Sequence, residues 1–120
     1  MIQKILMVLF LNFIVSCSMG YEYHIVINNI GKKTITDANV YYGDFSSVGG
    51  VLPPGVNAGH MFVDCPIPDI ATVRWKTDDG LLHEERVEFN KNISKNFKGE
   101  IWFNIDDENT VKVHFKKETK

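Results

Sequence analysis

The fold is decided at residues 71–89, which read ATVRWKTDDGLLHEERVEF. Apolar and polar residues alternate as far as Trp75, which is the period of a strand with one buried face. Asp78-Asp79-Gly80 then supplies the left-handed backbone that a tight turn needs, and Leu81–Phe89 is the return strand. The segment therefore predicts a β-hairpin with Trp75 in the core.

Short alternating runs recur on both sides of this hairpin, with turn residues between them. They are Tyr23–Asn28, Ala38–Tyr42, Gly59–Asp64, Glu100–Ile105 and Thr110–Phe115. About seven short strands within residues 21–120 predict an all-β domain, an immunoglobulin-like sandwich of two sheets. A small barrel is the alternative arrangement.

The stretch between Gly43 and Ala58 is expected to be a loop. It contains Gly49-Gly50 and Pro53-Pro54-Gly55, and two prolines remove two donors from any strand ladder. Asn90–Phe97 is polar and has room for one helical turn at most.

The composition fits one folded domain and limits its partners. The chain has 120 residues, of which 44% are hydrophobic and 23% are charged. Its 13 Lys and Arg against 15 Asp and Glu give a net charge of −2, so it lacks the basic excess of a nucleic-acid-binding protein.

The first sixteen residues have the layout of a signal peptide. Met1–Lys4 carries one positive charge, and Ile5–Val15 is an apolar run broken only by Asn12. A bilayer-spanning helix needs about 20 apolar residues, so this run is too short for a permanent span.

The apolar run ends in Ile14-Val15-Ser16-Cys17, which resembles the lipobox of bacterial lipoproteins. The resemblance implies cleavage before Cys17 and anchoring of the acylated Cys17 in a lipid bilayer. Ser18, where an Asp would retain the protein in the inner membrane, implies the outer membrane and a domain facing the periplasm. Residues 17–20 are then a tether that reaches only about 10–14 Å. The alternatives are an ordinary signal peptide cut near Gly20 or an uncleaved buried helix.

No motif for catalysis, a metal or a cofactor occurs in the chain, so we expect a protein that is not an enzyme. Cys65 is expected to be a small buried residue, or to pair with Cys17 if the lipobox interpretation is wrong. The histidines at positions 24, 60, 83 and 114 lack the close spacing of zinc ligands. The acidic pairs at Asp78-Asp79, Glu84-Glu85 and Asp106-Asp107 are expected to solvate turns.

Two aromatic residues are candidates for binding a partner. Trp102 alternates with Ile101 and Phe103, and Tyr41 alternates with Val40 and Tyr42, so both are expected on the face opposite the core. Exposed aromatic residues dominate binding hot spots. The alternative is that both pack beneath the loop at residues 48–59.

Residues 36–89 resemble small lipoproteins, some of which are immunity proteins against type VI secretion effectors. The resemblance rests on residues 47–55 (SVGGVLPPG), Pro66-Ile67-Pro68-Asp69 and Val73-Arg74-Trp75. It implies a partner toxin that acts in the periplasm. The sequence thus favours a lipid-anchored envelope protein that binds another protein. The alternative is a structural lipoprotein that holds an envelope complex at the membrane.

Overall fold

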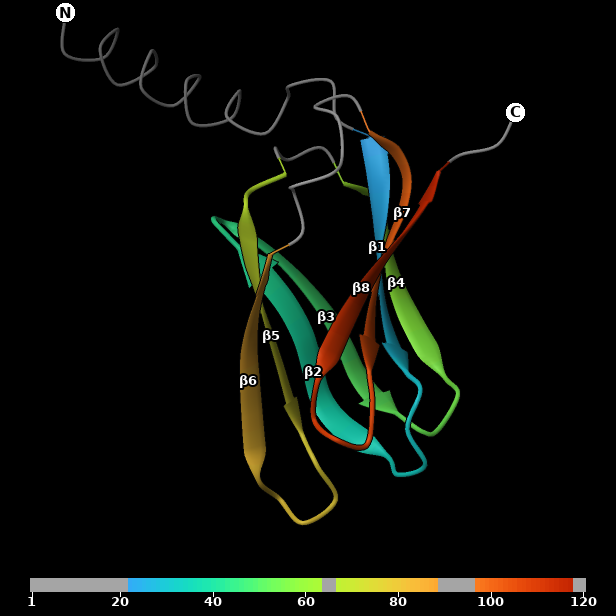
Figure 1. Ribbon diagram of the computed structural model, residues 1–120, viewed down its shortest axis with the longest axis vertical. Helices are drawn as coiled ribbons and strands as arrows, with labels where there is room; N and C mark the ends of the chain where they lie inside the picture. The colour runs from blue at the N-terminus through green and yellow to red at the C-terminus, as the bar shows by residue number, and fades with distance from the viewer. Residues whose placement is uncertain (1–21, 64–66, 89–96, 118–120) are drawn as a thin grey trace, which may run out of the picture.

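The fold is a β-sandwich of two four-stranded sheets, seen in a computed structural model that describes residues 22–63, 67–88 and 97–117 (Figure 1). Sheet A has the order β4-β1-β7-β8 and sheet B the order β3-β2-β5-β6. The strands are β1 (Glu22–Asn29), β2 (Ile35–Tyr42), β3 (Phe45–Leu52), β4 (Asn57–Val63), β5 (Ile70–Lys76), β6 (Leu82–Glu88), β7 (Lys98–Ile105) and β8 (Val111–Lys117). The predicted all-β sandwich is confirmed, with eight strands where the sequence suggested about seven.

The central strands of sheet A show why alternation builds this core. β1 and β7 run parallel, with Ile25 opposite Ile101 and Ile27 opposite Phe103. All four side chains are fully buried between the sheets, while their chain neighbours point outward. Val111, Val113 and Phe115 of the edge strand β8 are only partly buried, because no further strand covers that side of sheet A.

The hairpin at residues 70–88 forms as the sequence predicts. β5 and β6 are antiparallel, with Arg74 opposite Glu84 and Trp75 opposite His83. Gly80 takes a positive φ of 82° in the turn, as Asp-Gly turns require. Trp75 is fully buried, so its predicted place in the core is confirmed.

The expectation of a loop between Gly43 and Ala58 is wrong for its first half, which forms the edge strand β3. β3 pairs with β2, and the pairing shifts register at Gly50, whose φ is 70°. The two glycines therefore form a bulge within a strand instead of ending it. The prolines lie after the strand, at positions 53 and 54, where no ladder donor is needed.

The strand directions separate two ends of the sandwich. β1 starts at one end, called here the N-terminal end, and finishes at the opposite end, where the loops at residues 30–34, 53–56, 77–81 and 106–110 gather (Figure 1). Asn29 joins the two sheets at this loop end: its amide donates to the carbonyl oxygens of Lys33 and Leu52, each at 2.8 Å. Its side-chain oxygen accepts the Gly31 amide at 2.9 Å, so this buried residue is fully paired.

Candidate functional site

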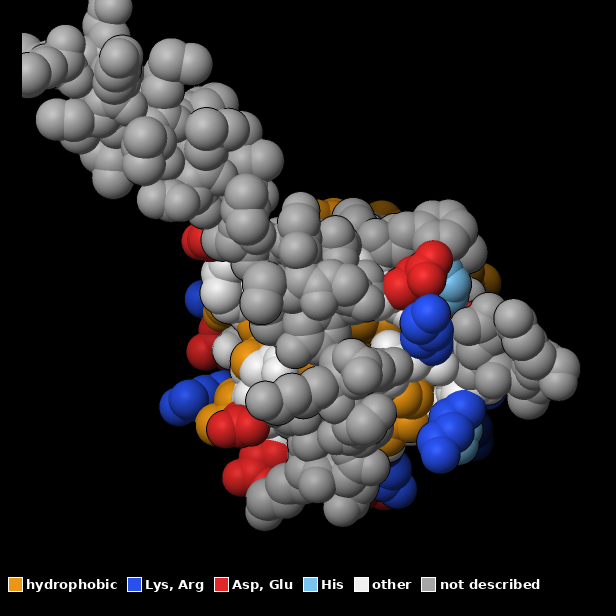
Figure 2. Space-filling model, turned by 90° about the horizontal axis from the view of Figure 1, so that it is seen from above, with side chains coloured by type: hydrophobic (Ala, Val, Ile, Leu, Met, Phe, Trp, Pro, Cys, Tyr) orange, Lys and Arg blue, Asp and Glu red, His pale blue; other side chains and the backbone are white. Residues whose placement is uncertain are grey.

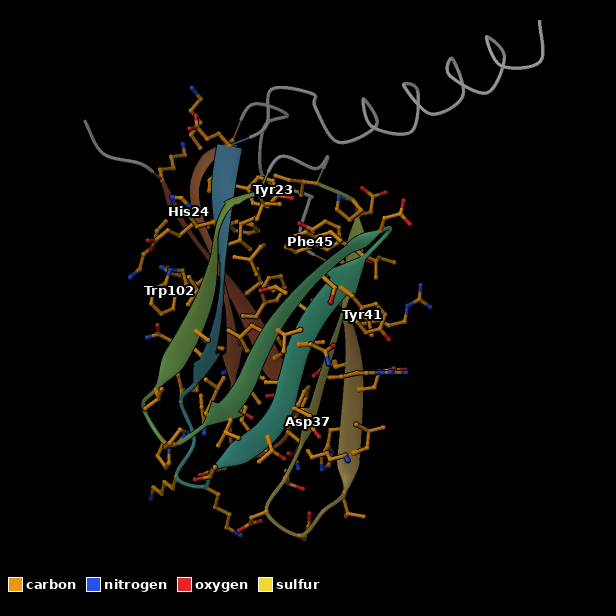
Figure 3. The ribbon with its side chains drawn as sticks, turned by 180° about the vertical axis from the view of Figure 1, so that it is seen from behind. Tyr23, His24, Asp37, Tyr41, Phe45 and Trp102 are labelled. Atoms are coloured by element: carbon orange, nitrogen blue, oxygen red, sulfur yellow. The ribbon has the colours of Figure 1, made fainter. Side chains whose placement is uncertain are left out.

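The two predicted contact residues lie on opposite outer faces of the sandwich, so they cannot belong to one flat interface. Trp102 lies in the middle of sheet A, on β7, and Tyr41 lies in sheet B, on β2 (Figure 3). Both side chains are half-buried and point away from the core, as alternation predicts. Each face must therefore be considered as a separate candidate site.

Trp102 is held in place by its neighbours on sheet A. Its indole N–H donates to Glu100 Oε1 at 2.8 Å, and Lys116 Nζ lies 4.3 Å from the centre of the indole ring. His114 is its register partner on β8, and Val26 is its partner on β1. Val26 is only 7% exposed although it points outward, so this part of the face is packed as well as polar.

Tyr41 belongs to a hydrogen-bonded group on sheet B. Its hydroxyl donates to Glu84 Oε1 at 3.1 Å, and Arg74 Nε donates to the same oxygen. The Arg74 guanidinium lies 5.4 Å from the centre of the Tyr41 ring. The hydrogen bond from Arg74, followed by that from Tyr41, lowers the pKa of Glu84 below its usual value. The three side chains thus form one fixed unit, which we call the Tyr41 triad.

Four exposed aliphatic side chains share the outer face of sheet B with the Tyr41 triad. They are Val48 and Val51 on β3, Ile70 on β5 and Leu82 on β6, all on the outer face of sheet B. Val48 is 74% exposed, the highest value among the large hydrophobic residues that the structure describes. The sequence analysis missed this patch because residues 48 and 51 fell within the expected loop. Their alternation with Ser47 and Leu52, both buried, is the signal that could have revealed it.

A hollow of about 180 Å³ opens between the loops at the loop end. It is lined in part by Lys33, Thr77, Asp78, His83 and Asn109. The His83 ring stacks on Trp75, with ring centres 5.6 Å apart, and Trp75 Nε1 donates to Asn109 Oδ1 at 3.4 Å. These contacts tie the hollow to the core.

The carboxylates around the hollow accept backbone amides, from their own loop for Asp106 and from the loop at residues 30–34 for Asp107. Asp107 accepts two bonds from the Lys32 amide, at 2.8 and 3.0 Å, and Asp106 accepts the amides of Glu108 and Thr110 at 3.0 Å. The Thr110 hydroxyl contributes most to lowering the pKa of Asp106, and the Thr77 hydroxyl does so for Asp79. The expectation that these acidic residues serve turns is confirmed for Asp79 and Asp106, whereas Asp107 joins two loops, Glu84 pairs with Arg74 and Glu85 accepts the Val111 amide.

The structure describes only some of the remaining candidate residues from the sequence. His24 and His114 lie on the outer face of sheet A, in different rows, and His83 lies at the hollow. Across the described ranges, no three His, Cys, Asp or Glu side chains come together as a metal would require. Cys17, Cys65 and residues 1–16, which the sequence predicts to be a signal peptide, lie outside the described residues.

Within residues 22–63, 67–88 and 97–117 there is no helix with the length and apolar character needed to cross a membrane.

Comparison with known proteins informs the fold only. No family model matches the chain, and no curated protein matches it. An NMR structure of a protein from Eubacterium rectale is similar, with a TM-score of 0.52 and 14% sequence identity over 81% of this chain and 90% of that chain. At this level of identity, the similarity shows that the two chains share a fold.

Proposed function

We propose that the protein is a lipid-anchored protein of the bacterial cell envelope, and that its sandwich binds a protein partner through the outer face of sheet B. The observation that carries the proposal is the Tyr41 triad, Tyr41, Arg74 and Glu84, on a face that also exposes Val48, Val51, Ile70 and Leu82. Tyr and Arg are the residues most enriched in binding hot spots, and a ring of apolar contacts excludes water from them.

The triad is suited to binding because it is already ordered. A free Tyr or Arg side chain loses rotamer freedom when a partner fixes it, and this cost lowers affinity. Here Glu84 fixes both Tyr41 and Arg74 before any partner arrives. Since Arg74 and Glu84 form an ion pair, the triad offers a partner matched polar groups.

The four aliphatic residues define the chemistry of the partner. Exposed aliphatic side chains on the same face as a Tyr and an Arg add apolar contact area to a protein interface. They favour a partner surface that has both apolar side chains and hydrogen-bonding groups. The resemblance over residues 36–89 supports a secreted toxin as that partner, because β3 and β5 both fall within it.

Anchoring at Cys17 rests on the lipobox resemblance at Ile14-Val15-Ser16-Cys17. Two or more acyl chains give lasting attachment, since each buried methylene contributes about 0.8 kcal/mol. Cys17→Ser should abolish fatty-acid labelling and leave an uncleaved or released chain. Unchanged labelling and membrane extraction in this variant would exclude Cys17 as the acylated residue.

Photo-crosslinking in the intact envelope tests the binding face. A crosslinking residue at Thr72, between Tyr41 and Arg86 in the sheet register, should capture a specific protein, and the same residue at Asn104 on sheet A should not. Tyr41→Ala should remove the adduct, while Asn104→Ala should leave it unchanged. Capture of a toxin whose activity is blocked would identify an immunity protein, and capture of a resident envelope complex would identify the structural alternative. Equal adducts at both positions would contradict the proposal.

A further inference from the structure

The outer face of sheet A differs from that of sheet B in a way that suggests a second occupant. We propose that this face, centred on Trp102, lies on the bilayer to which the chain is anchored, with Trp102 at the level of the lipid headgroups. The proposal rests on the proposed anchoring at Cys17. Its occupant is a lipid surface that contains anionic headgroups.

The outer faces of the two sheets differ in their charged side chains. The outer face of sheet A carries Lys98, Lys112 and Lys116 against Glu22 and Glu100, with His24 and His114 between them. On the outer face of sheet B, Arg74, Lys76 and Arg86 are balanced by Asp37, Glu84 and Glu88, so the face of sheet A differs by one positive charge. Figure 2, seen onto the N-terminal end, shows Lys and Arg side chains on both flanks, with most of the Asp and Glu side chains on the left, the side of β5 and β6 in Figure 1.

The loop end is the opposite of this face in charge. Its loops contain Asp78, Asp79, Asp106, Asp107 and Glu108 against Lys32 and Lys33. An anionic bilayer attracts lysines near its surface and repels carboxylates over a distance of about 10 Å at physiological salt. The carboxylates therefore make the loop end a less favourable contact with anionic lipid than the face of sheet A.

The tether places this face within reach. Cys17 precedes Glu22, the first residue of β1, by five positions, and five extended residues span at most about 17–18 Å. β1 is a central strand of sheet A, and Glu22 itself pairs with Lys98 of that face at 3.9 Å. A short tether keeps the local concentration of lipid high, so weak contacts suffice to hold the face down.

Trp102 has the properties of an interfacial residue. Tryptophan concentrates at membrane–water boundaries, where its ring meets the acyl boundary and its N–H remains in a polar environment. Here the ring is bordered by Lys116, which can meet a phosphate, and the N–H is bonded to Glu100. With sheet A on the lipid, sheet B lies about 10 Å higher and presents the Tyr41 triad to the aqueous side.

Fluorescence of the acylated full-length protein in vesicles tests the orientation. The chain has two tryptophans, and Trp75 is fully buried, so lipid-dependent changes report on Trp102. In phosphatidylethanolamine–phosphatidylglycerol vesicles with brominated acyl chains, we expect quenching of the wild type. We expect that quenching to be lost in Trp102→Phe, which keeps only Trp75.

Charge reversal supplies the matched control. Lys112→Glu and Arg86→Glu each replace an exposed cation on the outer face of an edge strand, β8 in sheet A and β6 in sheet B. Lys112→Glu, combined with Lys116→Glu, should lower quenching several-fold and raise access of aqueous iodide to Trp102. Arg86→Glu should leave both values at those of the wild type.

Three results would overturn the proposal, and they are distinguishable. Acylated, vesicle-bound protein with no lipid quenching of Trp102 would exclude the orientation and leave the anchor intact. Protection of Trp102 only after a protein partner is added would assign this face to that partner. Absence of the acyl mass on Cys17 would remove the tether, and with it both this inference and the proposed anchoring.

Discussion

The outer faces of the two sheets share one feature, a central outward-pointing aromatic residue, but differ in the side chains around it. Each has an aromatic residue in the middle of a central strand, Trp102 on β7 and Tyr41 on β2. Around Trp102 are lysines and a packed Val26, and around Tyr41 are a neutral ion pair and exposed aliphatic residues. An outward aromatic residue is therefore not a sufficient sign of one kind of site, because its cross-strand neighbours decide what it can bind.

The two outer faces keep their places only while the sheets stay packed together, and Asn29 is one of the residues that join the sheets at the loop end. Asn29→Ala should lower the free energy of unfolding by about 2–4 kcal/mol, because it leaves buried carbonyl and amide groups of two loops without partners. Urea unfolding followed by far-ultraviolet circular dichroism measures this. Asn104→Ala, on the outer face of sheet A, is the control and should cost under about 1 kcal/mol. Equal losses in the two variants would show that Asn29 does not join the sheets.

The edge strands offer a second contrast between the sheets. Gly50→Ala in β3 should destabilise the protein by about 1–2 kcal/mol, because the residue has a φ of 70° and alanine is strained there. The space around it is open, so the strain alone is measured. Gly59→Ala in β4 is the matched control, since the added methyl group would lie at ordinary contact distances of 3.5 and 3.8 Å from β1. A neutral Gly50→Ala would show that the bulge is not required in β3.

The alternation of apolar and polar residues predicts some features of this fold and not others. It identifies which side of a strand is buried, and Ile101, Phe103 and Ile105 all obey it. It does not say which sheet a strand joins, so it placed Trp102 and Tyr41 outward without revealing that they lie on opposite faces. β3 escaped detection because its glycine bulge exists only through pairing with β2.

The candidate site was predictable in its aromatic residues and not in their surroundings. The sequence allowed Arg74 to face Glu84, but only the register of β5 and β6 selects that pairing. Tyr41 reaches Glu84 across two strand pairs, which no local pattern encodes. The turn carboxylates were easier, because their acceptor role depends on amides within a few residues of each of them.

Acid titration tests the loop end that both faces share. The pKa of Asp106 is lowered in the folded protein, first by the Thr110 hydroxyl, so its charged form stabilises the fold at neutral pH. That stabilisation should be lost as the pH falls below the usual carboxylate value of about 4 toward the lowered pKa. Asp106→Asn should cost about 1 kcal/mol at pH 7 and flatten the decline in acid. Thr110→Val should also reduce the loss of stability in acid, but by less than Asp106→Asn. If the stability of Asp106→Asn and of the wild type falls in parallel with pH, the Asp106 carboxylate does not cause the acid-dependent loss.

Replacing either of the two outward-pointing aromatic residues, Tyr41 or Trp102, should have the smallest effect on stability. Tyr41→Phe and Trp102→Phe should each change the free energy of unfolding by less than about 0.5 kcal/mol, because both side chains point outward and neither leaves a buried polar group unpaired. Urea titration of both variants measures this, with Trp75→Phe as a control that must cost more since Trp75 fills the core. If Trp102→Phe proved as costly as Trp75→Phe, Trp102 would be a structural residue and the face of sheet A would have no free aromatic to bind with. If both outer variants keep the stability of the wild type, and only the Tyr41 variant loses the partner adduct while only the Trp102 variant loses lipid quenching, the two faces have separate functions.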